Sequence, residues 1–335
     1  MMKKGISVLG LNGKSVLLLP FIYLGQMITG QSVRVFTLST PSSTSSGRNN
    51  NDKNNKLREA IIGAMINKCV PGGYYKTQHW NRLKQAVEGF LRQCAIFDGA
   101  GESSGYSMVK CINTAGRGHN YDFLLIFTAN DGTTREYKVE FKFNASKISD
   151  LPQFVQLTKP SEYLSESYEE FFYDNYLQTI VNAAQFTTAT PSREEWLKQV
   201  QQDKPKCMLL YKEKYKSNSQ FSEMCKKVSA ESICQFITEQ DLNIDKLTKR
   251  LLETQSGKTY MFFKPPPITK SMNTGATITI YQTTTDDFTI VSCSKNPKMS
   301  RYECIMQSGK KMNVLLRWKN GNGIANPAFQ IGFVK

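Results

Sequence analysis

Two apolar segments joined by a short polar connection constrain the fold of this 335-residue chain more than any other feature. The first segment reads Tyr121-Asp-Phe-Leu-Leu-Ile-Phe127, the second reads Tyr137-Lys-Val-Glu-Phe-Lys-Phe143, and Asn130-Asp-Gly-Thr133 lies between them. An Asp-Gly pair between strand-like segments is the strongest short-range signal for a β-hairpin. We therefore predict two antiparallel strands, over residues 122–129 and 135–144.

The alternation of residue types in the second strand predicts which side chains share a face. Residues two apart on a strand point the same way. One face is apolar and is expected to enter the core, whereas Glu140 and Lys142 project from the other; the apolar face carries Val139, Phe141 and Phe143. Neighbouring strands lie about 5 Å apart, so the hairpin can bring Asp122 towards Glu140.

The first strand begins with an acidic residue in an otherwise apolar run. Phe123 to Phe127 lacks polar alternation, which predicts a strand covered on both faces. A carboxylate at the end of such a strand is costly unless it binds something. Asp122 is therefore a candidate ligand.

Two carboxylates beside an amine suit phosphodiester chemistry. Mg²⁺ prefers carboxylate, water and phosphate oxygens, and a bound metal lowers the pKa of a coordinated water. A nearby lysine adds positive charge where the transition state gains negative charge. We predict an Mg²⁺ or Mn²⁺ site with Asp122 and Glu140 as ligands and Lys142 as the catalytic amine. The alternative is that Glu140 and Lys142 are solvated charge partners, which are common on polar strand faces.

An Asp on one strand and Glu-x-Lys on the next resembles the PD-(D/E)xK nuclease superfamily, which has the restriction-endonuclease-like fold. The resemblance covers about residues 57–160 and rests on Asp122, Glu140 and Lys142. It implies an α/β (α+β) fold, with a mixed β-sheet core flanked by helices. It also implies a metal-dependent nuclease that hydrolyses phosphodiester bonds in DNA; the mode of cleavage, exo- or endonucleolytic, and cleavage of RNA stay open.

The same resemblance implies supporting residues outside the two strands. Glu59 matches an acidic residue on the helix before the sheet, and Gln153 and Gln156 match a glutamine that follows the lysine strand. The chain departs from the family pattern in one respect, because Asn120-Tyr121 and no proline precede Asp122.

Charge is the second guide to function. The formal net charge is +15 and the pI is about 9.3. This excess suits a nucleic acid first and an anionic membrane second, and simple solubility is the alternative. Residues 255–335 carry eleven Lys and Arg against three Asp and Glu, a net charge of +8. Candidate nucleic-acid contacts are Arg117, His119, Arg317, Trp318 and Lys319.

Each of these contacts has a structural alternative. Arg117 and His119 also fit a polar loop that enters a strand. Arg317-Trp-Lys319 fits either base stacking and backbone binding, or a strand end with Trp318 in the core.

We expect three regions: a leader and low-complexity linker over 1–56, a nuclease-like α/β domain over 57–255, and a basic β-rich region over 256–335 that is separate or packed on the same core. Helical spacing predicts helices over residues 57–67, 81–94, 163–187, 193–202 and 221–252. Further strands are predicted over residues 106–112, 208–211, 261–263, 276–281, 288–292 and 312–318.

Cysteine usage and the N-terminus bear on the compartment. The eight cysteines form no Cys-x-x-Cys and there are two histidines, which argues against a structural zinc site. Scattered cysteines indicate reduced thiols in an intracellular protein, although their even number leaves disulfides open. The run Val16–Leu24 resembles a signal-peptide core but is too short to span a bilayer, so we expect no stable membrane insertion.

Two rival functions stay open beside the nuclease. A nucleic-acid-binding protein without catalysis would use the charge and keep the carboxylates for structure. A secreted or surface binding protein would explain the apolar N-terminal run and the even number of cysteines.

Overall fold

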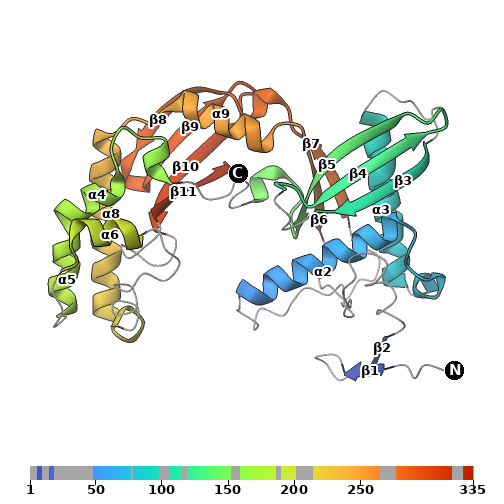
Figure 1. Ribbon diagram of the computed structural model, residues 1–335, viewed down its shortest axis with the longest axis horizontal. Coiled ribbons are helices and arrows are strands. Elements are labelled where there is room, and N and C mark those ends of the chain that lie inside the picture. The colour runs from blue at the N-terminus through green and yellow to red at the C-terminus, as the bar shows by residue number, and fades with distance from the viewer. Residues whose placement is uncertain are drawn as a thin grey trace. The chain divides into compact units, whose positions relative to one another are not determined.

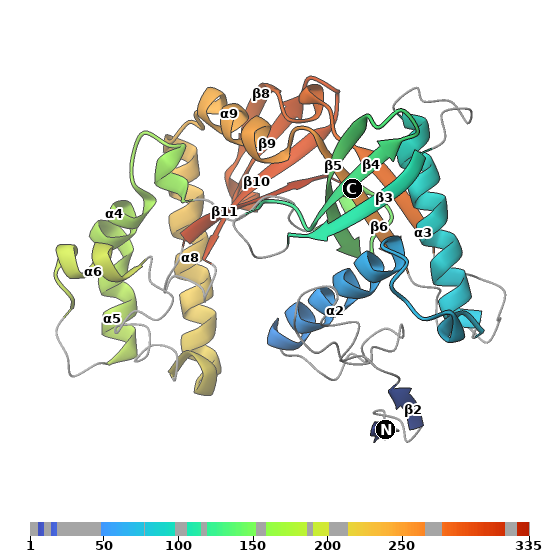
Figure 2. The same cartoon turned by 45° about the vertical axis from the view of Figure 1, so that its right-hand side comes forward.

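The computed structural model describes eleven segments of the chain: residues 6–9, 15–18, 48–76, 78–97, 106–114, 119–151, 159–185, 190–200, 214–264, 277–318 and 327–334. The elements are labelled in Figures 1 and 2. The strand expected over residues 208–211 lies outside the described residues. Near the N-terminus, β1 (Ile6–Leu9) and β2 (Ser15–Leu18) pair as an antiparallel hairpin.

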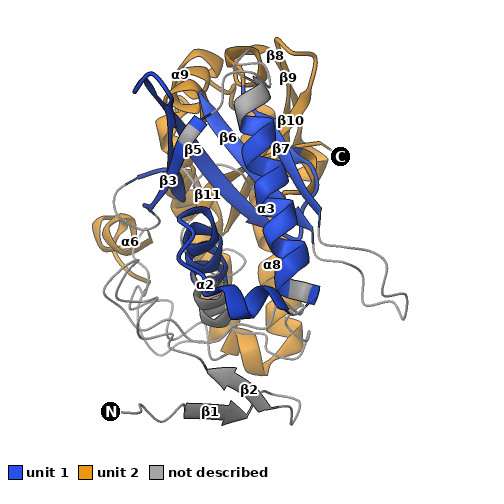
Figure 3. Cartoon of the chain, turned by 90° about the vertical axis from the view of Figure 1, so that its right-hand side faces the viewer, with its two compact units in different colours: residues 1–148, 257–283 blue, residues 149–256, 284–335 orange. Residues whose placement is uncertain are grey.

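The chain divides into two compact units that are both discontinuous (Figure 3). Unit 1 contains residues 1–148 and 257–283, and unit 2 contains residues 149–256 and 284–335. The boundaries of the two units differ from those of the expected regions. Residues 257–283, which the expected boundary assigns to the C-terminal region, belong to unit 1 and supply two strands of its sheet.

Unit 1 is built on a five-stranded mixed sheet, which confirms the α/β class. The strand order is β3-β4-β5-β6-β7, and every neighbouring pair is antiparallel except β5 and β6. The strands are β3 (Tyr106–Asn113), β4 (Phe123–Ala129), β5 (Thr134–Phe143), β6 (Lys258–Lys264) and β7 (Thr277–Gln282). The parallel pair is joined by a long connection, because the chain leaves unit 1 after Ile148 and returns at Gly257.

Two helices supply the rest of the core of unit 1, α2 (Arg48–Ile66) and α3 (Gln78–Phe97). Their apolar side chains form one cluster with Phe123, Leu125, Val139 and Phe141 of the sheet. The expected orientation of the second strand is therefore confirmed. The expectation for the first strand holds on one face only, because Leu124 and Ile126 between these positions are half-buried.

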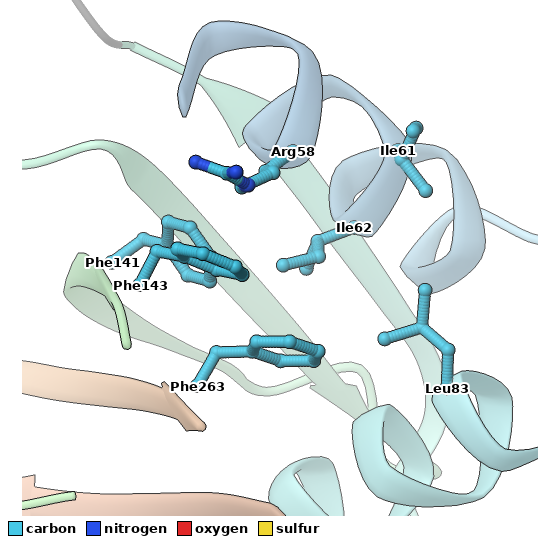
Figure 4. A pocket seen from close by; sticks show the side chains of 7 residues that line it. All are labelled: Arg58, Ile61, Ile62, Leu83, Phe141, Phe143 and Phe263. Atoms are coloured by element: carbon cyan, nitrogen blue, oxygen red, sulfur yellow. The ribbon is translucent and has the colours of Figure 1, made fainter. Parts of the chain in front are cut away.

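Helix α2 begins nine residues before the expected start at Leu57. A helix adds residues at little cost once a buried turn has formed, so an asparagine-rich segment can extend it. The guanidinium of Arg58 lies 3.5 Å from the ring centroid of Phe143, and Phe143 stacks on Phe263 at 5.7 Å (Figure 4). The Arg58 contact packs this turn of α2, which also carries Glu59, against β5.

The hairpin between β4 and β5 has the predicted turn. The amide of Gly132 donates to Ala129 O, and the Asp131 carboxylate accepts from the amide and hydroxyl of Thr133. Gly132 has a φ of +85°, which a side chain would strain. The register pairs Phe123 with Val139, so Asp122 is brought beside Glu140 as expected.

Unit 2 contains a four-stranded antiparallel sheet in the order β11-β10-β9-β8. Its strands are β8 (Ile290–Asn296), β9 (Arg301–Met306), β10 (Lys311–Trp318) and β11 (Pro327–Phe333). Its helices are α4 (Tyr168–Phe172), a π-helical turn η4 (Tyr173–Leu177), α5 (Gln178–Ala184), α6 (Arg193–Val200), α8 (Ser219–Glu239) and α9 (Ile244–Gln255).

Short 3₁₀ turns occur in both units, at Gly72–Lys76, Ile148–Asp150, Pro160–Glu162, Thr285–Asp287 and Pro297–Met299.

The single helix expected over residues 221–252 is two helices. Gln240 ends α8 with extended backbone, and its side chain is buried and accepts a hydrogen bond from Ser165. Asn243 then caps α9 by accepting from the amide of Lys246. Among the described residues, no helix combines the length and the apolar character needed to cross a bilayer.

Candidate active site

Asp122 lies at the start of β4 and is held by backbone contacts on both sides. Its amide donates to Val139 O at 2.9 Å, and its carbonyl accepts from the amide of Thr114 at 2.9 Å. Its Oδ2 accepts from the amide of Phe141 at 2.8 Å. That amide lies between Glu140 and Lys142 in the chain, so the Asp122 carboxylate is fixed beside the Glu-x-Lys segment.

Glu140 and Lys142 are directly paired on β5. Lys142 Nζ lies 2.5 Å from Glu140 Oε1, and the side chains are 26% and 14% exposed. The alternation of β5 explains the pairing, because the residues on either side of Glu140 point into the core. The structure therefore brings together all three residues that the sequence singles out as catalytic.

A second lysine, which the sequence reasoning missed, reaches the same carboxylate. Lys258 Nζ lies 3.4 Å from Glu140 Oε2, and its side chain is 3% exposed. The parallel register pairs Lys258 with Lys138 and Tyr260 with Glu140. Lys258 is a charged residue at the start of an apolar strand, as Asp122 is, and this pattern could have marked it as a candidate. The sequence does not show, however, that this strand pairs with β5.

Glu59 completes the group from helix α2. It is 7% exposed, and its Oε2 has no hydrogen-bond partner among the described residues. Burial raises the pKa of Glu59 to about 8, and the charges of Asp122 and Glu140 add to the shift. We call Glu59, Asp122, Glu140, Lys142 and Lys258 the acid–amine cluster.

The pKa shifts of the other members reflect the same crowding. Burial, followed by repulsion from Glu140, raises the pKa of Asp122 to about 6. Burial of Lys142 acts to lower its pKa, but the attraction of Glu140 prevails and the pKa is raised. At Lys258 burial prevails over the attraction of Glu140, and the pKa is lowered. Lys142 is therefore a firmly cationic group.

The donor set fits a hard divalent cation. Three carboxyl groups lie near two amines, and Glu59 Oε2 is a buried oxygen with no hydrogen-bond partner in the part of the chain that the structure describes. Mg²⁺ is usually bound through one or two carboxylates plus water and phosphate oxygens. Within the described part of the chain, no group of three or more His, Cys, Asp or Glu side chains is gathered closely enough to hold a metal ion by itself.

The remaining candidate residues are dispersed. His119 is exposed and its ring lies 5.1 Å from that of Tyr121, three residues before Asp122. Arg317 is exposed and donates to Gln330 Oε1 at 2.7 Å. Trp318 is 3% exposed in the core of unit 2, where its Nε1 donates to Tyr168 Oη at 3.1 Å. The described residues do not include Arg117, Gln153, Gln156 and Lys319.

The burial of Trp318 matches its core alternative rather than base stacking. Phe172 packs edge-on against it, with ring centroids 4.8 Å apart, and Trp196 lies at 6.5 Å. A base could stack on this ring only if the core of unit 2 opened.

Comparisons with models of protein families, with curated proteins and with solved structures find no match to this chain.

Proposed function

We propose that the protein is a metal-dependent nuclease that hydrolyses phosphodiester bonds in DNA. The observation that carries the proposal is the acid–amine cluster, in which Asp122 from β4 and Glu140 and Lys142 from β5 are held together by hydrogen bonds. The formal net charge of +15 supports a polyanionic substrate.

Each residue of the cluster has a distinct task in this proposal. Asp122 and Glu140 would hold Mg²⁺ or Mn²⁺, which when bound polarises the scissile phosphate and activates a water molecule. Lys142 stays protonated, because Glu140 keeps its pKa raised, and so it stabilises negative charge on the phosphate rather than removing a proton. Lys258 would help to orient Glu140 through the other oxygen of its carboxylate, Oε2.

The fold supports the same proposal at a finer level. A mixed sheet carries the Asp at the start of one central strand and the Glu-x-Lys pair on the next, and α2 carries an acidic residue against that sheet. This is the arrangement that the PD-(D/E)xK resemblance implies, and we propose that unit 1 has the restriction-endonuclease-like fold.

The proposal is tested with the full chain on plasmid and linear DNA in the presence of Mg²⁺. Glu140→Gln and Lys142→Met should each lower the cleavage rate by about 100-fold or more. Glu136→Gln and Lys138→Met are matched controls, because both residues lie on the same strand and are exposed. The controls should cleave at the wild-type rate.

Two outcomes would overturn the assignment. Cleavage that survives in both Glu140→Gln and Lys142→Met would mean that another site, or a contaminant, is responsible. Salt-sensitive DNA binding by the wild type without cleavage, in Mg²⁺ and in Mn²⁺, would favour a non-catalytic binding protein. Thermal melting of each variant establishes that it is folded.

A further inference from the structure

Two cysteines of unit 2 lie directly opposite each other on adjacent strands. The antiparallel register of β8 and β9 pairs Cys293 with Cys304, and their Sγ atoms are 2.8 Å apart. Directly opposite residues of antiparallel strands have Cα atoms about 4.5–5.5 Å apart. This separation lies within the range of about 4.4–6.8 Å that a disulfide spans. The backbone can therefore accept a bond between these sulfurs without rearrangement.

The surroundings of the two thiols give them different roles. Cys304 is 1% exposed, whereas Cys293 is half-buried on the edge strand β8 and is open to a reagent. The hydrogen bond from Cys304 lowers the pKa of the Cys293 thiol. The same contact, together with burial, raises the pKa of Cys304. A partly exposed thiol with a lowered pKa therefore lies beside a buried thiol with a raised pKa.

We propose that Cys293 and Cys304 form a cross-strand disulfide by exchange with a small disulfide of the glutathione type. The bond would pin the edge strand β8 to β9 beside the register shift between Ile290 and Ser292. This inference does not depend on the proposed nuclease activity, because it concerns only the β8–β9 pair of unit 2.

The exchange balances in two steps. The Cys293 thiolate attacks one sulfur of oxidised glutathione, forms a mixed disulfide and releases one glutathione thiolate. Cys304 gives up its proton and attacks Sγ of Cys293, which releases the second glutathione and leaves the Cys293–Cys304 bond. Two protein thiols are oxidised, one small disulfide is reduced to two thiols, and the two protons end on those thiols.

The other described cysteines provide an internal comparison. They lie in other parts of the fold: Cys69 follows α2, Cys94 is in α3, Cys111 is in β3, and Cys225 and Cys234 are both in α8. Cys207 lies outside the described residues.

The test is peptide mapping of the full chain after incubation with excess oxidised glutathione, alkylation and trypsin digestion without reductant. Lys295, Lys298 and Arg301 lie between the two cysteines, so trypsin separates them unless a disulfide joins the peptides 271–295 and 302–310. We expect one joined pair, two hydrogens lighter than its parts. Alkylated Cys293 and Cys304, or glutathione that persists on wild-type Cys293, would overturn the proposal.

Variants make the result specific. Cys304→Ser should stop at the mixed disulfide, with glutathione retained on Cys293, and Cys234→Ser should form the Cys293–Cys304 bond as the wild type does. Oxidation should raise the melting temperature of the wild type by roughly 5–10 °C, as for a short closed loop, and should leave that of Cys293→Ser unchanged. An equal shift in Cys293→Ser would assign the stabilisation to another pair.

Discussion

Lys258 Nζ lies 3.4 Å from Glu140 Oε2, although 118 positions separate the two residues in the sequence. Lys142 holds the other oxygen of the same carboxylate at 2.5 Å. Glu140 is therefore compensated by one amine from its own strand, β5, and by one from β6, which runs parallel to β5. The contribution of each amine to stability can be tested by replacing one lysine at a time.

Replacing Lys258 by methionine should destabilise unit 1. The change leaves three acidic groups with one amine in a buried setting, and breaking a buried pair costs about 3 kcal/mol or more. Urea unfolding at pH 7 measures the loss, and Lys138→Met, which is exposed, should change the free energy of unfolding by less than about 0.5 kcal/mol. If Lys258→Met unfolds at the wild-type urea concentration, Lys258 does not compensate Glu140.

Glu59 should make the protein less stable as the pH rises. Its pKa is about 8 in the folded chain against an ordinary value of 4.5, so between these values the folded state binds a proton that the unfolded state has lost. The free energy of unfolding then falls by about 1.4 kcal/mol per pH unit, and the slope ends above pH 8. The slope from this group is absent below pH 4.5, where both states are protonated.

The measurement is urea unfolding from pH 7 to pH 8 without divalent metal. Asp122, whose pKa is about 6, is then mostly ionised in the folded state and adds little to the slope. Glu59→Gln removes the slope, so its advantage over the wild type should grow with pH. Glu88→Gln on α3, an exposed site, serves as the control. Parallel curves for the wild type and Glu59→Gln would show that Glu59 titrates normally.

The turn of the β4–β5 hairpin should depend on Gly132. Its φ of +85° is one that a residue with a side chain adopts at a cost of about 1–2 kcal/mol, and no atom crowds the position. Gly132→Ala should therefore lower the free energy of unfolding by about that amount. In Gly73→Ala an added Cβ also meets no atom within 4 Å and the backbone has no positive φ, so this variant should be nearly neutral. Equal effects of both would refute the explanation.

Trp318 should matter for the stability of unit 2 rather than for DNA contact. Removing a buried aromatic side chain leaves a cavity and costs about 3–5 kcal/mol, so Trp318→Ala should unfold unit 2 at lower urea. Arg317→Ala, at the neighbouring exposed position, should leave stability unchanged. If Arg317 contacts a phosphate, Arg317→Ala should reduce the slope of log binding constant against log salt concentration by about 1, because one fewer counterion is released on binding. Full stability of Trp318→Ala would contradict the packing.

Local patterns predicted much of unit 1. The Asp-Gly turn and the alternation on β5 were enough to place Glu140 and Lys142 on one face and Asp122 beside them. Helices α2 and α3 followed from apolar spacing, with differences at their ends. These features depend on residues close in the sequence, where turn chemistry and periodicity act directly.

Features that depend on distant residues were not predictable in the same way. Lys258 reaches Glu140 only because β6 pairs with β5, and no local signal specifies that partner. Strand β9 is not among the predicted strands. Its residues alternate between Arg301, Glu303 and Ile305 on one face and the buried Tyr302, Cys304 and Met306 on the other. The break at Gln240 was missed because its buried hydrogen bond with Ser165 comes from 75 positions away.

The parallel pairing of β5 and β6 also sets the order in which a nascent chain can assemble its site. Residues 1–148 include Asp122, Glu140 and Lys142, but β5 keeps an open edge until residues 149–256 have been synthesised and β6 follows. During that interval Glu140 lacks one of its two amines. A polypeptide that stops before residue 258 therefore carries the Asp and Glu-x-Lys residues but lacks Lys258 of the cluster. Completion of the site thus has to wait until residues 149–256 have been synthesised.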